Sequence, residues 1–181
     1  MRRPLLVLVP ALVALTVAAS ACSSTPTAST TTTGGGAASA TGEVQATATP
    51  TLPAVTGAGN TDHEPSIGAG TSPAPTQLQT RDLVTGTGTA AALTSTVKVQ
   101  YVGANYATGK DFDASWTDNG PATFSLNQVV PGFAQGISGM KVGGWREIVI
   151  PPALGYGAGG QPPAVGPNET LVFVVDLIAV Q

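Results

Sequence analysis

The sequence is poor in the side chains on which most enzyme chemistry depends. Its 181 residues include one cysteine, Cys22, and one histidine, His63, and only 9% of them are charged. A lone cysteine excludes an intrachain disulfide and a cysteine-based metal site. A lone histidine in a linker-like segment argues against a Ser-His-Asp triad and against most zinc chemistry in a folded domain. We therefore expect a function that needs no metal.

Positive charge is also scarce, and it is not clustered. The formal net charge is −3. Proteins that bind nucleic acid usually carry a basic patch on one face, whereas the basic side chains of the second half are scattered at Arg81, Lys98, Lys110, Lys141 and Arg146. We expect no nucleic-acid partner, and we expect the chain to be a monomer.

One short glycine pattern could suggest a nucleotide cofactor. Gly86-x-Gly88 faintly resembles a dinucleotide-binding fingerprint. No strong helix or βαβ unit follows it, and the fingerprint has meaning only in that context. The pattern therefore predicts a hairpin turn, and we expect no cofactor.

The first 21 residues have the three-part organisation of a secretory signal. Met1–Arg3 is a charged beginning, the apolar run over 5–15 is interrupted by Pro10, and Ala19-Ser20-Ala21 supplies small residues. A membrane-spanning anchor is the alternative, but the run is shorter than the roughly 20 residues that a bilayer requires. The sequence therefore predicts a signal peptide over residues 1–21.

Small residues directly before a lone cysteine resemble the lipobox of bacterial lipoproteins. In that family the cysteine is diacylated and becomes the mature N-terminus, which implies lipidation of Cys22. Ala19 stands where leucine is commonest, and an ordinary signal with an incidental cysteine remains the alternative. The resemblance implies an extracytoplasmic protein that is bound to the bacterial cell membrane through its lipid anchor only.

Residues 22–76 consist mainly of Ser, Thr, Ala, Gly and Pro. Such a segment buries too little apolar surface to offset its ordering entropy, so we expect it to be disordered and to act as a tether. Its Ser and Thr content leaves O-glycosylation open.

Residues 77–181 carry the folding signals. Alternating apolar and polar residues predict strands, and Phe133, Ile137 and Met140 share one face of a predicted helix. The sum is an α+β domain of about five antiparallel strands and one short helix. The strands are expected over 78–84, 96–106, 111–113, 122–126, 145–150 and 170–180, and the helix over 132–140.

The strand over 145–150 and the loop after it draw particular attention. The strand is expected to turn Ile148 and Ile150 inward and Glu147 and Val149 outward. The loop over 151–170 exceeds the roughly 12–15 residues above which loops are usually functional or disordered. It presents Tyr156 between two glycines, which predicts a binding lip.

A series of short motifs runs in fixed order through the folded part. They are Val99-x-Tyr101-x-Gly103, Gly109-Lys110-x-Phe112-Asp113-x-Ser115, Val129-Val130-Pro131-Gly132-Phe133, Gly139-Met140-x-Val142-Gly143, Ile150-Pro151-Pro152-x-Leu154-x-Tyr156-Gly157 and Thr170-Leu171-x-Phe173-x-Val175. Together they resemble the FKBP-type peptidyl-prolyl isomerase family over residues 77–181. The resemblance implies a twisted antiparallel sheet wrapped around a short helix, with the active pocket between the two.

The resemblance also implies a set of site residues. Its catalytic members are Tyr101, Phe112, Asp113, Tyr156 and Phe173, and its substrate-binding members are Val129, Val130, Phe133 and Val165. The implied partners are proline-containing polypeptides, with macrolides of the FK506/rapamycin type as candidate inhibitors.

Three positions depart from the family pattern. Asp118 stands where arginine is frequent, Ala122 replaces an aromatic of the pocket rim, and Gln161 replaces a loop histidine. These departures bear on substrate preference and on macrolide affinity.

Taken singly, the site residues have simpler interpretations. Tyr101 and Phe173 would be core residues, Asp113 would cap a turn, and Trp145 has no counterpart in the family's site and is expected to be structural. In register with the family, they favour a prolyl isomerase that assists the folding of exported proteins by desolvating the twisted amide. The alternative is a non-catalytic binding or chaperone module of the same fold at the cell surface.

Overall fold

The computed structural model describes residues 51–117 and 120–181. The predicted signal peptide, Cys22, tether residues 23–50 and Asp118 therefore lie outside the described residues. Within the described ranges, no helix is long and apolar enough to cross a membrane.

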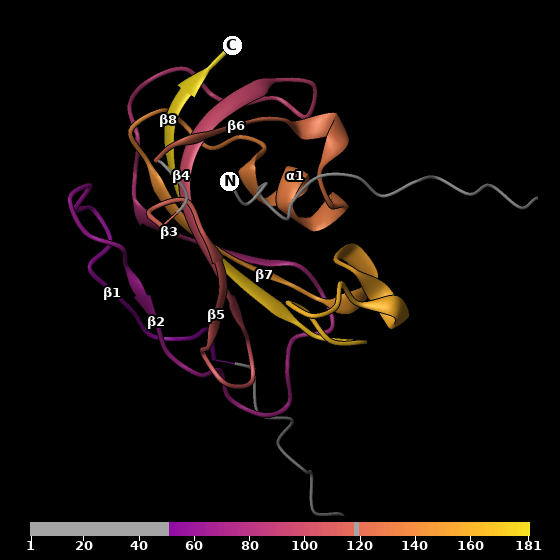
Figure 1. The fold of residues 1–181 in the computed structure, drawn as a ribbon. Helices are drawn as coiled ribbons and strands as arrows, with labels where there is room; N and C mark the ends of the chain where they lie inside the picture. Colours follow the sequence, from indigo (N-terminus) through magenta and orange to yellow (C-terminus); the bar gives the residue numbers. More distant parts are fainter. Residues whose placement is uncertain (1–50, 118–119) are drawn as a thin grey trace, which may run out of the picture. The chain divides into compact units, whose positions relative to one another are not determined.

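The main element of the described structure is an antiparallel sheet of six strands (Figure 1). The strand order is β3-β7-β8-β4-β5, and β6 also pairs with β4. This architecture confirms the predicted fold class. The strands are β3 (Gln79–Val84), β4 (Thr96–Asn105), β5 (Asp111–Ala114), β6 (Ala122–Ser125), β7 (Trp145–Ile150) and β8 (Leu171–Val180).

One helix, α1 (Pro131–Ile137), packs on the inner face of the sheet. It is shorter than the predicted span, because Ser138 follows it with backbone angles that are not helical. Phe133, Ile137 and Met140 are nevertheless buried together as the apolar spacing predicted. Three short 3-10 turns complete the described structure: η1 (Leu126–Gln128), η2 (Pro152–Leu154) and η3 (Gly157–Gly159).

Two glycines let the helix lie directly on β7. A Cβ atom on Gly132 would be 2.4 Å from Cγ2 of Ile150, and one on Gly136 would be 2.4 Å from Cγ2 of Ile148. Both separations are shorter than carbon atoms tolerate. Glycine weakens an isolated helix, but here it permits the close packing that supports this one.

β7 alternates between the two faces as predicted, with Ile148 and Ile150 on the inner face and Val149 on the outer face. The prediction of a half-buried strand, whose outward Glu147 and Val149 would be exposed, is wrong. Both are fully buried, because the outer face of the sheet is covered as well. A second core cluster lies on that face and consists of Ile67, Val102, Ala104, Tyr106, Ala114, Trp145, Val149, Val172 and Val174. Trp145 is structural, as expected: it is buried, and its ring centroid is 6.1 Å from that of Trp116.

The cover on the outer face comes partly from residues 51–76, which we call the N-terminal arm. We expected this segment to be disordered, but it forms the two-stranded sheet of β1 (Val55–Thr56) and β2 (Ser66–Ile67). Ile67 is 5% exposed within the outer cluster, and Leu52 packs against the same cluster. The few apolar residues of the arm suffice because the sheet offers them an apolar face.

Hydrogen bonds tie the arm to Tyr106 at the end of β4. The Gly70 N–H donates to the carbonyl of Tyr106 at 2.7 Å, and the Tyr106 hydroxyl donates to the carbonyl of Thr71 at 2.9 Å. The arm is therefore held by backbone groups as well as by apolar contact.

An ion pair between β3 and β7 also contacts the arm. Nη2 of Arg81 is 2.6 Å from Oε2 of Glu147, and it also donates to the carbonyl of Pro53 at 2.8 Å. Burial raises the pKa of Glu147, although the Arg81 guanidinium opposes that shift. Loss of Arg81 would leave a buried carboxylate uncompensated, which is strongly destabilising.

The predicted hairpin turn at Gly86-x-Gly88 is also wrong. β3 pairs with β7 and not with β4, the next strand along the chain. The segment instead runs beside the turn before β7, where the Gly88 N–H donates to the carbonyl of Val142 at 3.0 Å. The glycines mark the end of β3, but local sequence could not identify the strand that pairs with it.

Packing of the arm predicts that Ile67→Ala destabilises the folded chain. Truncation of a buried isoleucine typically costs about 2–5 kcal/mol. Urea unfolding followed by tryptophan fluorescence should show a lower midpoint. Leu93→Ala, at a side chain that is 52% exposed, is the matched control and should change little. Equal midpoints for the two variants would contradict packing of the arm on the sheet.

Candidate active site

Four aromatic rings from four different elements meet on the inner face of the sheet. Phe173 of β8 is the hub: its ring centroid is 5.2 Å from that of Phe133, 5.7 Å from Phe112 and 6.3 Å from Tyr101. The planes of Phe112 and Phe133 make angles of 88° and 72° with that of Phe173. These are edge-to-face contacts, which turn the positive ring edge of one residue toward the negative face of the next.

The rings can meet because Gly103 has no side chain. Gly103 lies opposite Phe173 in the pairing of β4 with β8. A Cβ atom there would be 2.6 Å from Cε1 of Phe173 and 2.8 Å from Cζ of Phe112. Gly103 belongs to the first quoted motif but not to the predicted site. Its position two residues after Tyr101, on the same face of a strand, was the available signal.

The polar part of the site is a hydrogen bond between Tyr101 and Asp113. The Tyr101 hydroxyl donates to Oδ2 of Asp113 at 2.8 Å, and Asp113 is only 8% exposed. Ser115 holds the backbone of this pair in place: the Tyr101 N–H donates to Oγ of Ser115 at 2.8 Å. Oγ of Ser115 in turn donates to Oε1 of Gln100 at 2.7 Å. Ser115 ends one of the quoted motifs but was not among the predicted site residues.

Tyr156 is half-buried against the same apolar cluster, between η2 and η3. Burial, and then the nearby Asp113 carboxylate, raise the pKa of Tyr156 to about 12. Its hydroxyl is therefore protonated at neutral pH and carries a proton that a hydrogen bond can use. Of the two glycines beside it, Gly157 has a positive φ of 60° and Gly155 does not.

The three predicted valines lie around the aromatic rings. Val130 precedes α1 and is buried, Val129 is partly buried, and Val165 is buried near the end of the long loop. The loop closes there, since the Gln161 N–H donates to the carbonyl of Val165 at 2.7 Å and the Val165 N–H returns a bond of 3.0 Å. Ala122 is partly buried against the same cluster.

The structure thus brings together all nine residues that the sequence predicted for catalysis and substrate binding. Eight belong to or pack on one apolar cluster, and Asp113 is joined to it through Tyr101. Phe124 of β6 was missed, although its ring is 5.7 Å from Tyr101 and 6.2 Å from Phe133. Among the described residues, no group of His, Cys, Asp and Glu side chains is placed to hold a metal ion.

Comparison with known sequences agrees with this geometry. A sequence model described as FKBP-type peptidyl-prolyl cis-trans isomerase matches residues 88–178. The chain is 48% identical over 111 residues to an FK506-binding protein of Streptomyces anulatus, which covers 59% of this chain and 88% of that protein. It is 40% identical over 116 residues to a probable FK506-binding protein of Corynebacterium glutamicum, with coverage of 64% and 98%.

Comparison with solved structures gives the same result. The crystal structure of FkpA from Escherichia coli superposes with a TM-score of 0.55 at 40% sequence identity. The match covers 59% of this chain and 49% of that one, so it concerns about half of FkpA.

The contacts of Gly103 predict that Gly103→Ala disturbs the rings. A methyl group there must displace Phe173 or Phe112, and overpacking of this kind costs about 1–3 kcal/mol. We expect a loss of at least about tenfold in kcat/KM for prolyl isomerisation, because small displacements at a catalytic site have large effects on rate.

Gly159→Ala is the matched control, since a Cβ atom on Gly159 has no neighbour within 4 Å and its φ is not positive. A Gly103→Ala variant with the activity of this control would contradict the proposed arrangement of the rings.

Proposed function

The chain belongs to the FKBP-type peptidyl-prolyl cis-trans isomerase family and isomerises prolyl bonds, and we propose that it acts on exported polypeptides from a lipid anchor outside the cytoplasm. One observation carries the assignment of the site: the buried hydrogen bond between Tyr101 and Asp113 lies beside a cluster of edge-to-face aromatic rings.

The reaction suits a site of this composition. Rotation about the peptide bond breaks amide resonance, against a barrier of about 18–20 kcal/mol. No bond between heavy atoms forms or breaks, so the protein needs neither a nucleophile nor a proton transfer. The twisted amide is less charge-separated than the planar one. An apolar site therefore stabilises the transition state more than the ground state.

Different residues of the site would contact different parts of the substrate. Phe133, Phe173 and Val165 would seat the proline ring, with Val129 at the partly exposed edge. The edges of the aromatic rings would face the carbonyl oxygen of the rotating amide. A rate gain of about 10⁵-fold requires only roughly 7 kcal/mol, which shape and desolvation can supply.

Polar groups would hold the flanking substrate backbone. The Tyr156 hydroxyl is a neutral donor because its pKa is about 12. It and the backbone N–H of Val130 would each bind a substrate carbonyl. Asp113 accepts the hydrogen bond of Tyr101 and so fixes the orientation of that ring.

A non-catalytic binding module is the weaker alternative. It rests on Ala122 and Asp118, which depart from the family pattern, whereas FkpA of Escherichia coli and Mip of Coxiella burnetii, relatives at 44% and 41% identity, are named as isomerases. Other relatives are named FK506-binding proteins. On that basis we propose that a macrolide would bind to the same aromatic cluster and inhibit isomerisation.

The proposed location, outside the cytoplasm and on a lipid anchor, is inferred from the first 22 residues. A charged beginning, an apolar run and small residues before Cys22 have the form of a lipoprotein signal. Stable membrane attachment generally requires two lipid chains, which diacylation of this cysteine would provide.

We predict that kcat/KM of the double variant Phe112→Ala, Asp113→Ala is lower by a factor of at least about 10². The variant removes one aromatic ring of the site and the hydrogen-bond acceptor that orients Tyr101. The measurement is the rate of a proline-limited refolding reaction. Leu93→Ala combined with Asp62→Ala removes an exposed apolar side chain and an exposed carboxylate, and is the matched control. Wild-type turnover by a folded double variant would refute the site.

We also predict that the mature protein carries lipid on Cys22. Mass spectrometry of protein from bacterial membranes should show a diacylated N-terminal cysteine, and Cys22→Ser should abolish both the added mass and membrane retention. An unmodified mature N-terminus at another residue would refute the anchor.

A further inference from the structure

Three neighbouring hollows share lining residues along the base of the 151–170 loop. The first has a volume of about 380 Å³ and is lined by Phe112, Pro163, Ala164 and Glu169, among others. The second, of about 340 Å³, shares Asn105, Thr108 and Glu169 with the first. The third, of about 500 Å³, shares Ala74, Asn168 and Thr170 with the second. We call these three adjacent hollows the furrow.

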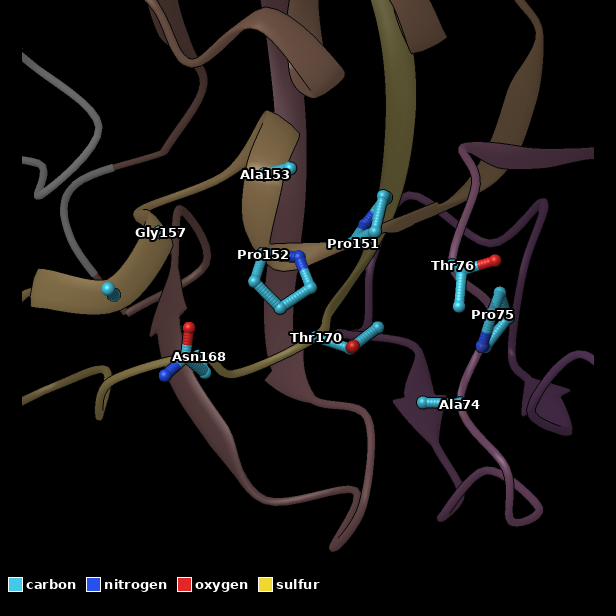
Figure 2. Close-up of a pocket in the computed structure, with 10 residues that line it drawn as sticks. Ala74, Pro75, Thr76, Pro151, Pro152, Ala153, Gly157, Asn168 and Thr170 are labelled. Carbon is cyan, nitrogen blue, oxygen red and sulfur yellow. The ribbon is translucent and has the colours of Figure 1, made fainter. Parts of the chain in front are cut away.

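The N-terminal arm forms one wall of the furrow. Figure 2 shows Ala74, Pro75 and Thr76 facing Pro151 and Pro152 from the other side of Thr170. The match to the family begins at residue 88. This wall therefore lies outside the part of the chain that the family model describes, and it is a feature added by residues 51–76.

The furrow begins at the active site. Phe112 lines the first hollow, and the same ring lies 5.7 Å from Phe173 in the aromatic cluster. A polypeptide whose proline lies on that cluster would reach the furrow directly when its chain continues past Phe112.

The lining suits an extended peptide. Pro75, Pro151 and Pro152 offer apolar rings, while Asn168 and Thr170 offer polar side chains that can bond to a peptide backbone. A hollow of several hundred cubic ångströms is in the range that binding sites use. Few large side chains line it, which leaves room for the side chains of the bound segment.

The end of the furrow near Phe112 carries more negative than positive side chains. Asp111 and Glu169 line the first hollow with only Lys110 to offset them. Within residues 51–117 and 120–181, no ion pair engages either carboxylate. Unpaired carboxylates at the edge of a groove favour a basic partner.

We propose that the furrow binds the part of the substrate polypeptide that flanks the isomerised proline, and that it prefers a basic residue near Glu169. This inference rests on the proposed function, since the occupant is the polypeptide whose proline lies in the active site. It makes the chain an isomerase for extended, unfolded segments, with a preference set partly by its own N-terminal arm.

The test compares peptide lengths with the full chain. One substrate has a proline with a single residue on each side, and two others extend it to about a dozen residues, one toward the N-terminus and one toward the C-terminus. One extended peptide should gain about tenfold or more in kcat/KM over the short one, the effect expected from burial of one aliphatic side chain.

Ala74→Trp separates the furrow from the active site. Ala74 is exposed and lines both the second and the third hollow, so an indole there would block the furrow without touching the aromatic cluster. We expect the gain from peptide length to vanish while activity on the short peptide is unchanged. Ala54→Trp, also exposed on the arm but lining none of the three hollows, should keep the gain.

The charge preference has its own pair of variants. A lysine in the favoured extension should raise kcat/KM above a glutamate at the same position, and Glu169→Gln should reduce that ratio. Asp62→Asn, at an exposed carboxylate of the arm outside the furrow, should leave the ratio intact.

The outcomes distinguish the two proposals. A wild-type chain that fails to isomerise the short peptide refutes the active site itself. A chain that isomerises the short peptide but gains nothing from either extension refutes the furrow. Retention of the full gain by Ala74→Trp refutes it equally, and an unchanged lysine-to-glutamate ratio in Glu169→Gln refutes the basic preference.

Discussion

The close contact between α1 and β7 is the constraint on which the active site depends. The helix lies on the strand at Gly132 and Gly136, where any side chain would overlap Ile150 or Ile148. Because the helix comes this near, Phe133 reaches 5.2 Å from Phe173. Gly103 serves the same purpose on β4, where it leaves room for the rings of Phe173 and Phe112. The arrangement of the aromatic rings therefore depends on the glycines, which have no side chains, as much as on the aromatic residues themselves.

The outer face of the sheet is the second determinant of the site. β4 and β8 are buried on both faces, with the aromatic cluster on one side and the outer cluster, partly supplied by the N-terminal arm, on the other. Strands buried in this way are fixed in position by packing from both sides. The arm thus stabilises the strands that carry Tyr101 and Phe173, and its end also forms a wall of the furrow.

The electrostatics of the site match a reaction that transfers no proton. Asp113 is nearly buried and is engaged by Tyr101, and the high pKa of Tyr156 keeps its hydroxyl neutral. These groups orient rings and donate hydrogen bonds. General acid–base catalysis would instead require a group that titrates near the working pH. The carboxylates of Asp111 and Glu169 lie farther along, in the furrow, where they can act on substrate preference.

Periodicity in the sequence sufficed to predict the antiparallel strands and the short helix, because these are local patterns. The nine site residues were implied by the resemblance to a known family, and the structure gathers them in and beside one apolar cluster. The sequence patterns did not reveal that Glu147 and Val149 are buried, that β3 pairs with β7, or that residues 51–76 fold. Each of these depends on contacts between segments far apart in the chain. A sparse apolar residue such as Ile67 is buried only because another segment offers it a complementary surface. The sequence determined what each segment could become, and tertiary packing decided which faces were covered, since burial is a property of pairs of surfaces and not of a single strand.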